Sequence, residues 1–280
     1  MRVFEIPEGT RTSKGRAIQN LINIGQDDKV KAFICTQDLK DEEYINSHYV
    51  IMATKNGQVK KTSLEQYSRP RTNGINAITI KDGDELLEAK LTTGDSQVML
   101  AVKSGKAIRF EEEKTRSMGR NASGVRGIRL NSDNDEVIGM ITINESESDV
   151  LVVSENGYGK RSSLEDYRIT NRGGKGVKTI SVTEKTGSLV AIKNVTDSDD
   201  LMIINKSGIA IRLEVDNLRV MGRATQGVRL IKVRDGDAIA AVAKVMSDDD
   251  DIEIDEDGNV IVQENNPNEI NDSDITKEEE

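Results

Sequence analysis

The residue types that usually carry acid–base or nucleophilic chemistry are scarce in this sequence. Its 280 residues include one histidine, His48, and one cysteine, Cys35. A single thiol excludes a disulfide framework and fits a reducing compartment, and a single histidine leaves a structural zinc site without its usual ligands. Acid–base catalysis would have to rest on carboxylates or lysines, and the carboxylates of residues 1–246 are scattered through predicted turns. We therefore expect no catalytic, metal or cofactor site in this chain.

Lysine and arginine recur instead at equivalent points of residues 1–246. A first group follows each predicted hairpin turn and comprises Lys60, Lys61, Arg109, Lys160, Arg161 and Arg212. A second group lies near a recurrent glycine and comprises Arg11, Lys14, Arg16, Arg69, Arg71, Arg116, Arg120, Arg168, Arg172, Lys175, Arg219 and Arg223. A third group follows that glycine and comprises Arg126, Arg129, Lys178, Arg229 and Lys232. Ordinary solvated strand ends are the alternative interpretation, but the repetition favours a basic band that binds a polyanion through its phosphates.

One loop of the second group, residues 172–176 (Arg-Gly-Gly-Lys-Gly), superficially resembles a phosphate cradle. It lacks the Ser or Thr that follows the lysine of a Walker motif, and a predicted strand rather than a helix comes next. A nucleotide site is therefore not expected. The small residues Gly173 and Gly174, with the two cations, suit a polyanion backbone that approaches the main chain closely.

The net charge of −10 hides two parts of opposite sign. Residues 247–280 contain fifteen acidic residues and one basic residue, whereas residues 1–246 contain 38 basic and 34 acidic residues. The body is therefore mildly basic and carries an acidic tail. The composition of the tail predicts disorder, and we expect the tail to compete with a polyanion for the basic band.

The spacing of glycines indicates that the body consists of repeats. At spacings of 48, 52 and 51 residues, Asn-Gly or Ser-Gly pairs end at Gly57, Gly105, Gly157 and Gly208. A second glycine before an apolar-rich segment recurs at Gly74, Gly124, Gly176 and Gly227, and once near the start at Gly15. Residues 103–130 also realign with 206–233 at an offset of 103 without a gap. The chain thus holds four full units and the second half of a fifth.

Each unit is predicted to be β-structure, because apolar runs such as 98–102 and 107–110 flank the turn pairs. Only short segments such as 63–67 and 163–167 could form a helical turn. About fifty residues per unit predict an all-β, propeller-like β-pinwheel with four four-stranded blades plus a half blade and a disordered acidic tail. The expected parts are an incomplete blade over 1–24, blades over 25–80, 81–130, 131–182 and 183–246, and the tail over 247–280. Four and a half blades do not close a ring, so we expect a piece of a longer protein.

The aromatic residues indicate which polyanion the band would bind. They make up 3% of the chain, and there is no Trp, so stacking platforms for single-stranded nucleic acid are mostly absent. Repeated cations without base-reading helices suit duplex DNA held by its phosphates. A curved rim would bend the duplex, at a cost on the order of 1–6 kcal/mol that several phosphate contacts could offset. A propeller-like protein-interaction scaffold is the alternative, and its binding would depend little on salt.

The repeated segments 56–67, 117–130, 155–167 and 220–230 closely resemble the family of C-terminal domains of DNA gyrase A, and residues 5–21 resemble the second blade of that domain. The resemblance implies a β-pinwheel that wraps duplex DNA with a fixed hand, within a cytoplasmic type II topoisomerase that introduces negative supercoils. The implied partners, in an A2B2 heterotetramer, are two copies of gyrase B and a second copy of gyrase A, with ATP and Mg²⁺ used by other regions. No membrane is implied, and no apolar run approaches the 18 residues that a membrane span needs.

Two departures from the family pattern bear on this interpretation. The family's Gln-Arg-Arg-Gly-Gly-Lys-Gly box belongs to the first blade, and the similar heptad at 170–176 lies in a later blade. None of the five tyrosines lies in the family's Arg-Tyr-Thr catalytic context, so this chain alone is not expected to cut DNA. The alternative within the same superfamily is the related C-terminal domain of topoisomerase IV, which selects DNA geometry without strong wrapping.

Overall fold

The computed structural model describes residues 3–10, 12–22, 24–25, 28–71, 73–144, 148–234 and 236–246, and the backbone of 253–254 and 260–261. Contacts divide the chain into two compact units, Met1–Val245 and Met246–Glu280. In the second unit, β16 (Glu253–Ile254) pairs antiparallel with β17 (Val260–Ile261). The rest of the expected tail lies outside the described residues, so its disorder stays a prediction.

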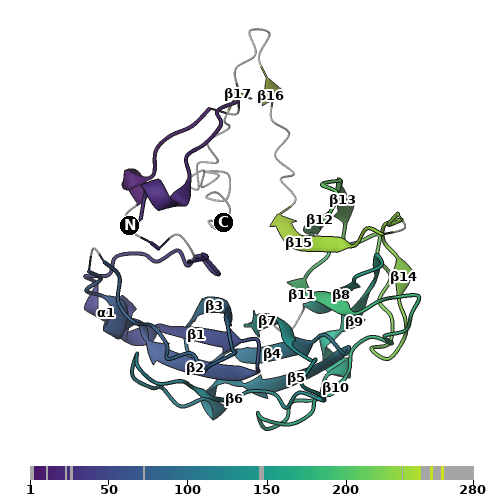
Figure 1. Ribbon diagram of the computed structural model, residues 1–280, viewed down its shortest axis with the longest axis horizontal. Helices are drawn as coiled ribbons and strands as arrows, with labels where there is room; N and C mark the ends of the chain where they lie inside the picture. Colours follow the sequence, from purple (N-terminus) through teal and green to yellow (C-terminus); the bar gives the residue numbers. More distant parts are fainter. Residues whose placement is uncertain are drawn as a thin grey trace, which may run out of the picture. The chain divides into compact units, whose positions relative to one another are not determined.

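The first unit is built from β-sheets, as predicted, and we call each sheet a blade (Figure 1). The first blade has the strand order β3-β1-β2-β6, with β1 Tyr49–Thr54, β2 Gln58–Ser63, β3 Leu86–Thr92 and β6 Val125–Arg126. The second has the order β10-β5-β4-β7, with β4 Gln97–Val102, β5 Lys106–Glu111, β7 Val137–Ile143 and β10 Val177–Lys178. The third has the order β11-β8-β9-β14, with β8 Asp149–Ser154, β9 Tyr158–Ser163, β11 Leu189–Val195 and β14 Val228–Arg229. The fourth has three strands in the order β13-β12-β15, with β12 Asp199–Asn205, β13 Ala210–Glu214 and β15 Ile239–Met246.

The helical segments are short. One α-helix, α1 (Glu42–Ser47), begins after Asp41, whose carboxylate accepts hydrogen bonds from the backbone of Glu43 and Tyr44. Short 3₁₀ helices span Val3–Glu5, Ile18–Asn20, Leu64–Tyr67, Glu112–Lys114 and Leu164–Asp166. Those at 64–67 and 164–166 fall where the sequence predicted helical turns. In residues 3–10 and 12–22, where half a blade was expected, the structure has 3₁₀ turns and no strand.

The outermost strand of each four-stranded blade comes from later in the chain than the blade's own hairpin. β6 follows β4 and β5 in sequence, yet Val125 and Arg126 pair with Val59 and Gln58 of β2. β10 and β14 pair in the same way with β5 and β9. We call β6, β10 and β14 the donated strands. The expected blade 81–130 therefore supplies β3 and β6 to the first blade and β4 and β5 to the second, so the repeats and the blades do not share boundaries. Periodicity alone fixes the repeat length, but long-range strand pairing decides which strands form one sheet.

The recurrent second glycine makes this exchange possible. Gly124 has a φ of 86°, and a Cβ atom there would lie 2.5 Å from the carbonyl oxygen of Val59. Gly176 and Gly227 also have positive φ, and a Cβ atom on either would overlap the carbonyl oxygen of Ala107 or Gly159. A residue with a side chain would both strain the backbone and push the donated strand away from the blade that receives it.

The hydrophobic core lies between neighbouring blades. Leu100 of β4 packs in one buried cluster with Ile51 of the first blade, whereas the adjacent Met99 packs in another cluster with Val152 of the third. A third cluster joins Leu151 of the third blade to residues of the fourth. Successive side chains of a strand face opposite sides of the sheet. The inner strands β1, β4 and β8 therefore bury both faces, which explains why these three strands are nearly continuous apolar runs.

Candidate nucleic-acid interface

The loops that precede the donated strands form one connected edge. We call residues 116–124, 168–176 and 219–227 the rim loops. Backbone hydrogen bonds link each to the segment that follows the preceding second glycine, running from Thr79 N to Ala122 O (3.2 Å), Arg129 N to Gly174 O (2.8 Å) and Ser181 N to Thr225 O (3.1 Å). Figure 1 shows β6, β10 and β14 on the outer side of the first three blades, opposite β3, β7 and β11. The rim loops lead directly into the donated strands, so both follow the same outer edge of the blades.

The exposed cations of the edge come from all the rim loops and donated strands, and from the segment before Gly74. They are Arg69, Arg71, Arg116, Arg126, Arg129, Arg168, Lys175, Lys178, Arg219, Arg229 and Lys232. None of them forms a salt bridge with a carboxylate in the described part of the chain. Lys14 and Arg16 are exposed in the segment before the first blade, and Arg11 lies outside the described residues. The edge thus carries positive charge that no described carboxylate neutralises through a salt bridge.

Two lysines of the predicted band lie inside the blades instead. Lys60 is fully buried, and its Nζ donates to the carbonyl oxygens of Ala77 and, at 2.6 Å, Arg120. Lys160 occupies the same place in the third blade and donates to Gly222 O at 2.7 Å and to Thr225 Oγ1 at 3.2 Å. Burial lowers the pKa of each lysine from 10.5 to about 8, and Arg120 acts in the same direction on Lys60. These lysines hold the rim loops from beneath rather than facing solvent.

The other four cations of the first group already contact acceptor groups of the chain. Lys61 Nζ lies 3.7 Å from Glu112 Oε1, and Arg161 pairs with Asp149 and Asp197, each at 2.5 Å. Arg109 Nη1 donates to Leu164 O and Tyr167 O at 2.8 and 3.1 Å. Arg212 is exposed but pairs with Asp200 at 2.5 Å. These four cations therefore already have partners. Most strands of a blade bury both faces, so the repetition of a charged residue in the sequence did not show whether its side chain faces solvent.

Three half-buried arginines of the second group each connect a rim loop to the segment that follows the preceding second glycine. Arg120 Nη1 donates to Asn76 O at 3.2 Å, and Arg172 Nη1 to Arg126 O at 3.1 Å. Arg223 Nη1 donates to Lys178 O at 2.9 Å. Each lies four residues before its second glycine, so the same spacing repeats the same contact. These guanidinium groups fix the rim loops relative to one another, and Arg172 also donates through Nε to Lys114 O at 2.8 Å.

The glycine-rich loop 172–176 lies within this connected edge. Gly173 has a φ of 81°, and its N–H donates to Gly127 O at 2.6 Å. Gly174 is exposed, as is the neighbouring Lys175. The loop therefore follows the second blade as a rim loop and offers close main-chain approach beside a free cation, with a strand after it rather than a helix.

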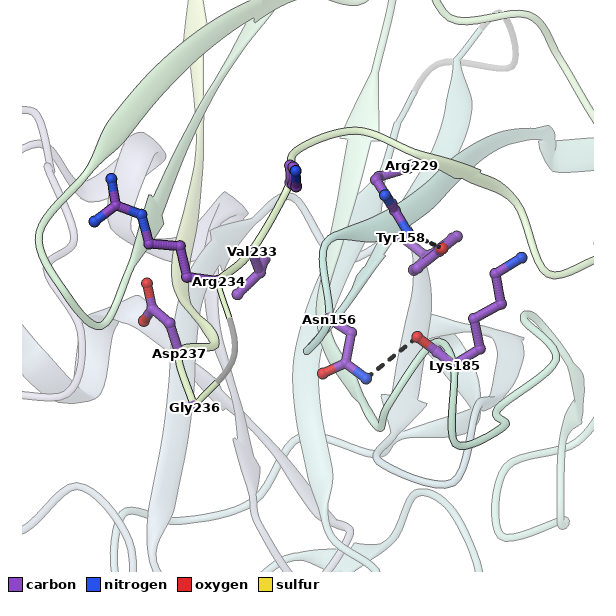
Figure 2. A pocket seen from close by; sticks show the side chains of 9 residues that line it. Asn156, Tyr158, Lys185, Arg229, Val233, Arg234, Gly236 and Asp237 are labelled. Atoms are coloured by element: carbon purple, nitrogen blue, oxygen red, sulfur yellow. Dashed lines mark hydrogen bonds between the residues drawn. The ribbon is translucent and has the colours of Figure 1, made fainter.

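A basic pocket of about 380 Å³ lies at the turn of the third blade (Figure 2). Its cations are Lys185, Arg229, Lys232 and Arg234. Arg229 Nη2 donates to Tyr158 Oη at 2.8 Å, and Lys185 Nζ lies 5.4 Å from the centre of the same ring. The carboxylate at the pocket, Asp237, already accepts from Ser207 and Asn205. The pocket therefore has a surplus of positive charge at its wall.

Lys185 and Arg234 of this pocket were missed by the sequence reasoning. At the other hairpins an aspartate caps the turn, as Asp84 accepts from Asn56 N at 2.9 Å and Asp135 from Ser104 N at 3.0 Å. In the third blade the equivalent segment is 184–187, Glu-Lys-Thr-Gly, and the carbonyl of Thr186 replaces the carboxylate. The sequence did contain a signal for this pocket, because in one repeat the capping aspartate is missing and a lysine, Lys185, is present.

Neither a metal centre nor a membrane-spanning helix is found in the described residues. No group of three or more His, Cys, Asp or Glu side chains there is arranged to hold a metal ion. No helix there is long and apolar enough to cross a membrane. The chemistry that the described site offers is electrostatic attraction and hydrogen bonding to an anionic backbone.

Comparisons with known proteins agree on one family. The family described as "DNA gyrase C-terminal domain, beta-propeller" matches residues 1–37, 48–93, 97–144, 148–196 and 199–246. The DNA gyrase A protein of Staphylococcus epidermidis is 44% identical over 251 residues, which cover 89% of this chain and 28% of that protein. Its counterpart from Staphylococcus aureus is 41% identical over 261 residues, which cover 93% of this chain and 29% of that protein. The chain thus spans less than a third of the length of these relatives.

Solved structures show the same fold. A C-terminal domain of DNA topoisomerase IV superposes with a TM-score of 0.79 at 24% identity, covering 87% of this chain and 74% of that chain. A DNA gyrase A C-terminal domain superposes with a TM-score of 0.73 at 25% identity, covering 84% of this chain and 76% of that chain. These likenesses match the predicted β-pinwheel architecture.

Proposed function

Because this chain belongs to the family of DNA gyrase C-terminal β-propeller domains, we propose that it binds duplex DNA along its basic outer edge and bends the duplex around the blades with a fixed hand. The observation that carries the proposal is the row of exposed cations on rim loops and donated strands, none of which pairs with a described carboxylate. Repeated contacts of this kind hold phosphates without reading sequence.

The aromatic residues support a duplex rather than a single strand as the ligand. Among the described residues of 49–246, the aromatic side chains, Tyr49, Tyr67, Phe110, Tyr158 and Tyr167, are buried or half-buried. Bases of a single strand would therefore find no exposed ring to stack on within these blades. The exposed phenylalanines of the described residues, Phe4 and Phe33, precede the first blade. Lys60, Lys61, Lys160 and Arg161 are excluded from the proposed contacts because they are buried, and Arg109 and Arg212 because they already have partners.

Within the longer protein, we propose that this bending presents a DNA segment for passage through a double-strand break during negative supercoiling. The support is that relatives at 41–44% identity are gyrase A proteins. The proposed partners are a second copy of gyrase A and two copies of gyrase B in the cytoplasm, with ATP and Mg²⁺ bound by regions other than this chain.

The salt dependence of DNA affinity tests the assignment of the edge. Replacing Arg126, Lys178 and Arg229, one cation on each donated strand, with glutamine is expected to lower the slope of log affinity against log salt by about 2–3. The matched control replaces Lys55, Lys103 and Lys206 with glutamine. These lysines occupy equivalent positions at three hairpin turns, and Lys55 and Lys103 already pair with carboxylates. Fluorescence anisotropy of a labelled duplex measures both slopes. Equal slopes for the two triple variants would contradict the assignment.

Plasmid relaxation by a nicking-closing enzyme in the presence of the 280-residue chain tests chiral bending. A protein-dependent shift of the linking-number distribution is expected after deproteinisation. Retained binding without a shift would contradict wrapping. It would favour instead a domain that selects DNA geometry, the function we hypothesised for the topoisomerase IV relative, whose fold superposes with a TM-score of 0.79.

A further inference from the structure

The three junctions between a donated strand and its receiving blade have the same geometry. Val125, Val177 and Val228 pair with the second residue after the hairpin glycine, which is Val59, Ala107 or Gly159. The hairpin glycine then accepts from the donated segment through its carbonyl, as Gly127 N donates to Gly57 O at 2.8 Å, Thr179 N to Gly105 O at 2.9 Å and Leu230 N to Gly157 O at 2.9 Å. One recognition pattern is therefore used three times.

The fourth blade has the receiving half of this pattern without a strand on it. Gly208 has a φ of 87°, like the other hairpin glycines, but a Cβ atom there would meet nothing within 4 Å. Ala210 is exposed, whereas the equivalent residues Val59 and Ala107 are fully buried. The preceding residue, Ile209, is 41% exposed. Among the described residues, β13 pairs only with β12.

The outer edge of β13 points its hydrogen-bonding groups into open space. Asn205 N donates to Ile209 O at 3.0 Å, so 205 and 209 form a hydrogen-bonded pair. The next pair is Ile204 with Ala210. In an antiparallel ladder that pair has its N–H and C=O groups directed away from the partner strand. Ala210 therefore offers one donor and one acceptor to a further strand, which is the usual liability of an edge strand.

Residues 74–80 have the donating half of the pattern, and no strand of the described residues pairs with them. Gly74 has a φ of 76°, with nothing within 4 Å of a Cβ atom, and is followed by Ile-Asn-Ala-Ile-Thr-Ile. Thr79 N donates to Ala122 O as Arg129 N does to Gly174 O, so the segment already lies in the donor position. Ile80 is 41% exposed. The backbone conformation that exchange requires is thus formed before any partner binds.

We propose that residues 74–80 of one copy add as the fourth strand to the last blade of a second copy. By the repeated register, Ile75 pairs with Ala210 and Asn76 with Ile209, while Ala77 N and Ile78 N donate to Gly208 O. The donor and receiving surfaces are different patches, so the contact is head-to-tail rather than two-fold symmetric. The partner is a second copy of this chain, because the donor segment 74–80 and the receiving edge of β13 both belong to this chain. Their sequences fit the pairing register that the chain already uses three times.

Sedimentation velocity of the 280-residue chain over a concentration series tests the proposal. We expect the average mass to rise with concentration. Ala210→Pro removes the outward N–H at an edge position where proline is tolerated, and Ile75→Pro removes the corresponding donor N–H. Each is expected to lower the association constant about tenfold or more. Glu214→Ala, at the far end of β13, is the matched control and should associate like the parent chain.

Mixing the two proline variants gives the sharper result. The Ala210→Pro variant keeps an intact donor segment, 74–80, and the Ile75→Pro variant keeps an intact receiving edge on β13. The mixture should therefore form one-to-one dimers that do not associate further. Ile209→Lys, which places a charge on the edge instead of a proline, should behave like Ala210→Pro if the latter fails to fold. A parent chain that stays monomeric at about 1 mM would overturn the proposal. So would a monomer in which the Ala210 amide is protected from hydrogen exchange, because another segment of the same chain would then cover the edge.

Discussion

Cations on neighbouring strands of one blade have different roles in this protein. Lys60 and Lys160 donate to carbonyls of the rim loops from inside the blades, whereas Arg126 and Arg229, on donated strands, face solvent. Because each buried ammonium group binds carbonyl oxygens of a rim loop, those oxygens point into the blade instead of toward solvent. The rim loops are then left with their cationic side chains outward, which is the charge arrangement that a phosphate backbone needs.

The buried lysines predict a pH dependence of stability. Burial lowers the pKa of Lys60 and Lys160 from 10.5 to about 8. Above about pH 8 the unfolded chain therefore holds protons that the folded chain has released, so the free energy of unfolding should rise with pH toward pH 10.5. Denaturant unfolding between about pH 7.5 and 9.5 measures this rise, and a Lys60→Met/Lys160→Met variant should show a flatter profile. An equal rise in the variant would show that other groups cause it.

The donated strand is the element that turns repeats into a connected domain. Each is only two residues long in the ladder, yet it crosses from one repeat to the blade of another. Its formation depends on a glycine that reaches positive φ and lets two backbones approach closely. A short strand of this kind has little intrinsic stability, so its position is set by the blade that receives it.

Two glycines with the same backbone conformation allow the cost of backbone strain to be separated from the cost of a steric clash. Gly176 and Gly74 have φ values of 70° and 76°, but only at Gly176 would a Cβ atom overlap a backbone carbonyl, that of Ala107. Gly74→Ala should cost about 1–2 kcal/mol through backbone strain. Gly176→Ala should cost more than about 3 kcal/mol, because the β10 junction must also open. Thermal and denaturant unfolding of the two variants compares them, and equal losses would mean that the junction contributes little.

At the scale of the molecule, charge is divided between the two parts of the chain. The body is mildly basic, while residues 247–280 carry fifteen acidic residues and one basic residue. A tethered polyanion has an effective concentration of about mM near its own domain. We therefore expect the tail to compete with DNA phosphates for the cations of the edge, and salt should weaken this competition because it screens the charges.

Removal of residues 247–280 is accordingly expected to tighten DNA binding, most strongly at low salt. The measurement is duplex affinity for 1–246 and 1–280 over a salt series, with linking-number analysis of the same two proteins. A tail of unchanged length with its acidic residues replaced by Ser and Gln is the control for chain length. Identical affinities at every salt concentration would sink the idea of competition.

The repeat length, the all-β class and the hairpins at the Asn-Gly and Ser-Gly pairs were readable from the sequence. Each depends on local rules, because a turn glycine needs positive φ and strand residues alternate or run apolar according to what covers them. A spacing that repeats four times also averages out the ambiguity of any single segment.

Only the tertiary structure decided which strands share a blade and which cations face solvent. Val125 lies far from Val59 in the chain, and nothing local states that they pair. Lys60 and Arg126 were both predicted to lie on the rim. A sequence shows which face of a strand meets solvent only when one face is polar and the other apolar. Here both faces of the inner strands are buried, so long-range packing, not local pattern, assigned Lys60 to the interior and Arg126 to the edge that meets solvent.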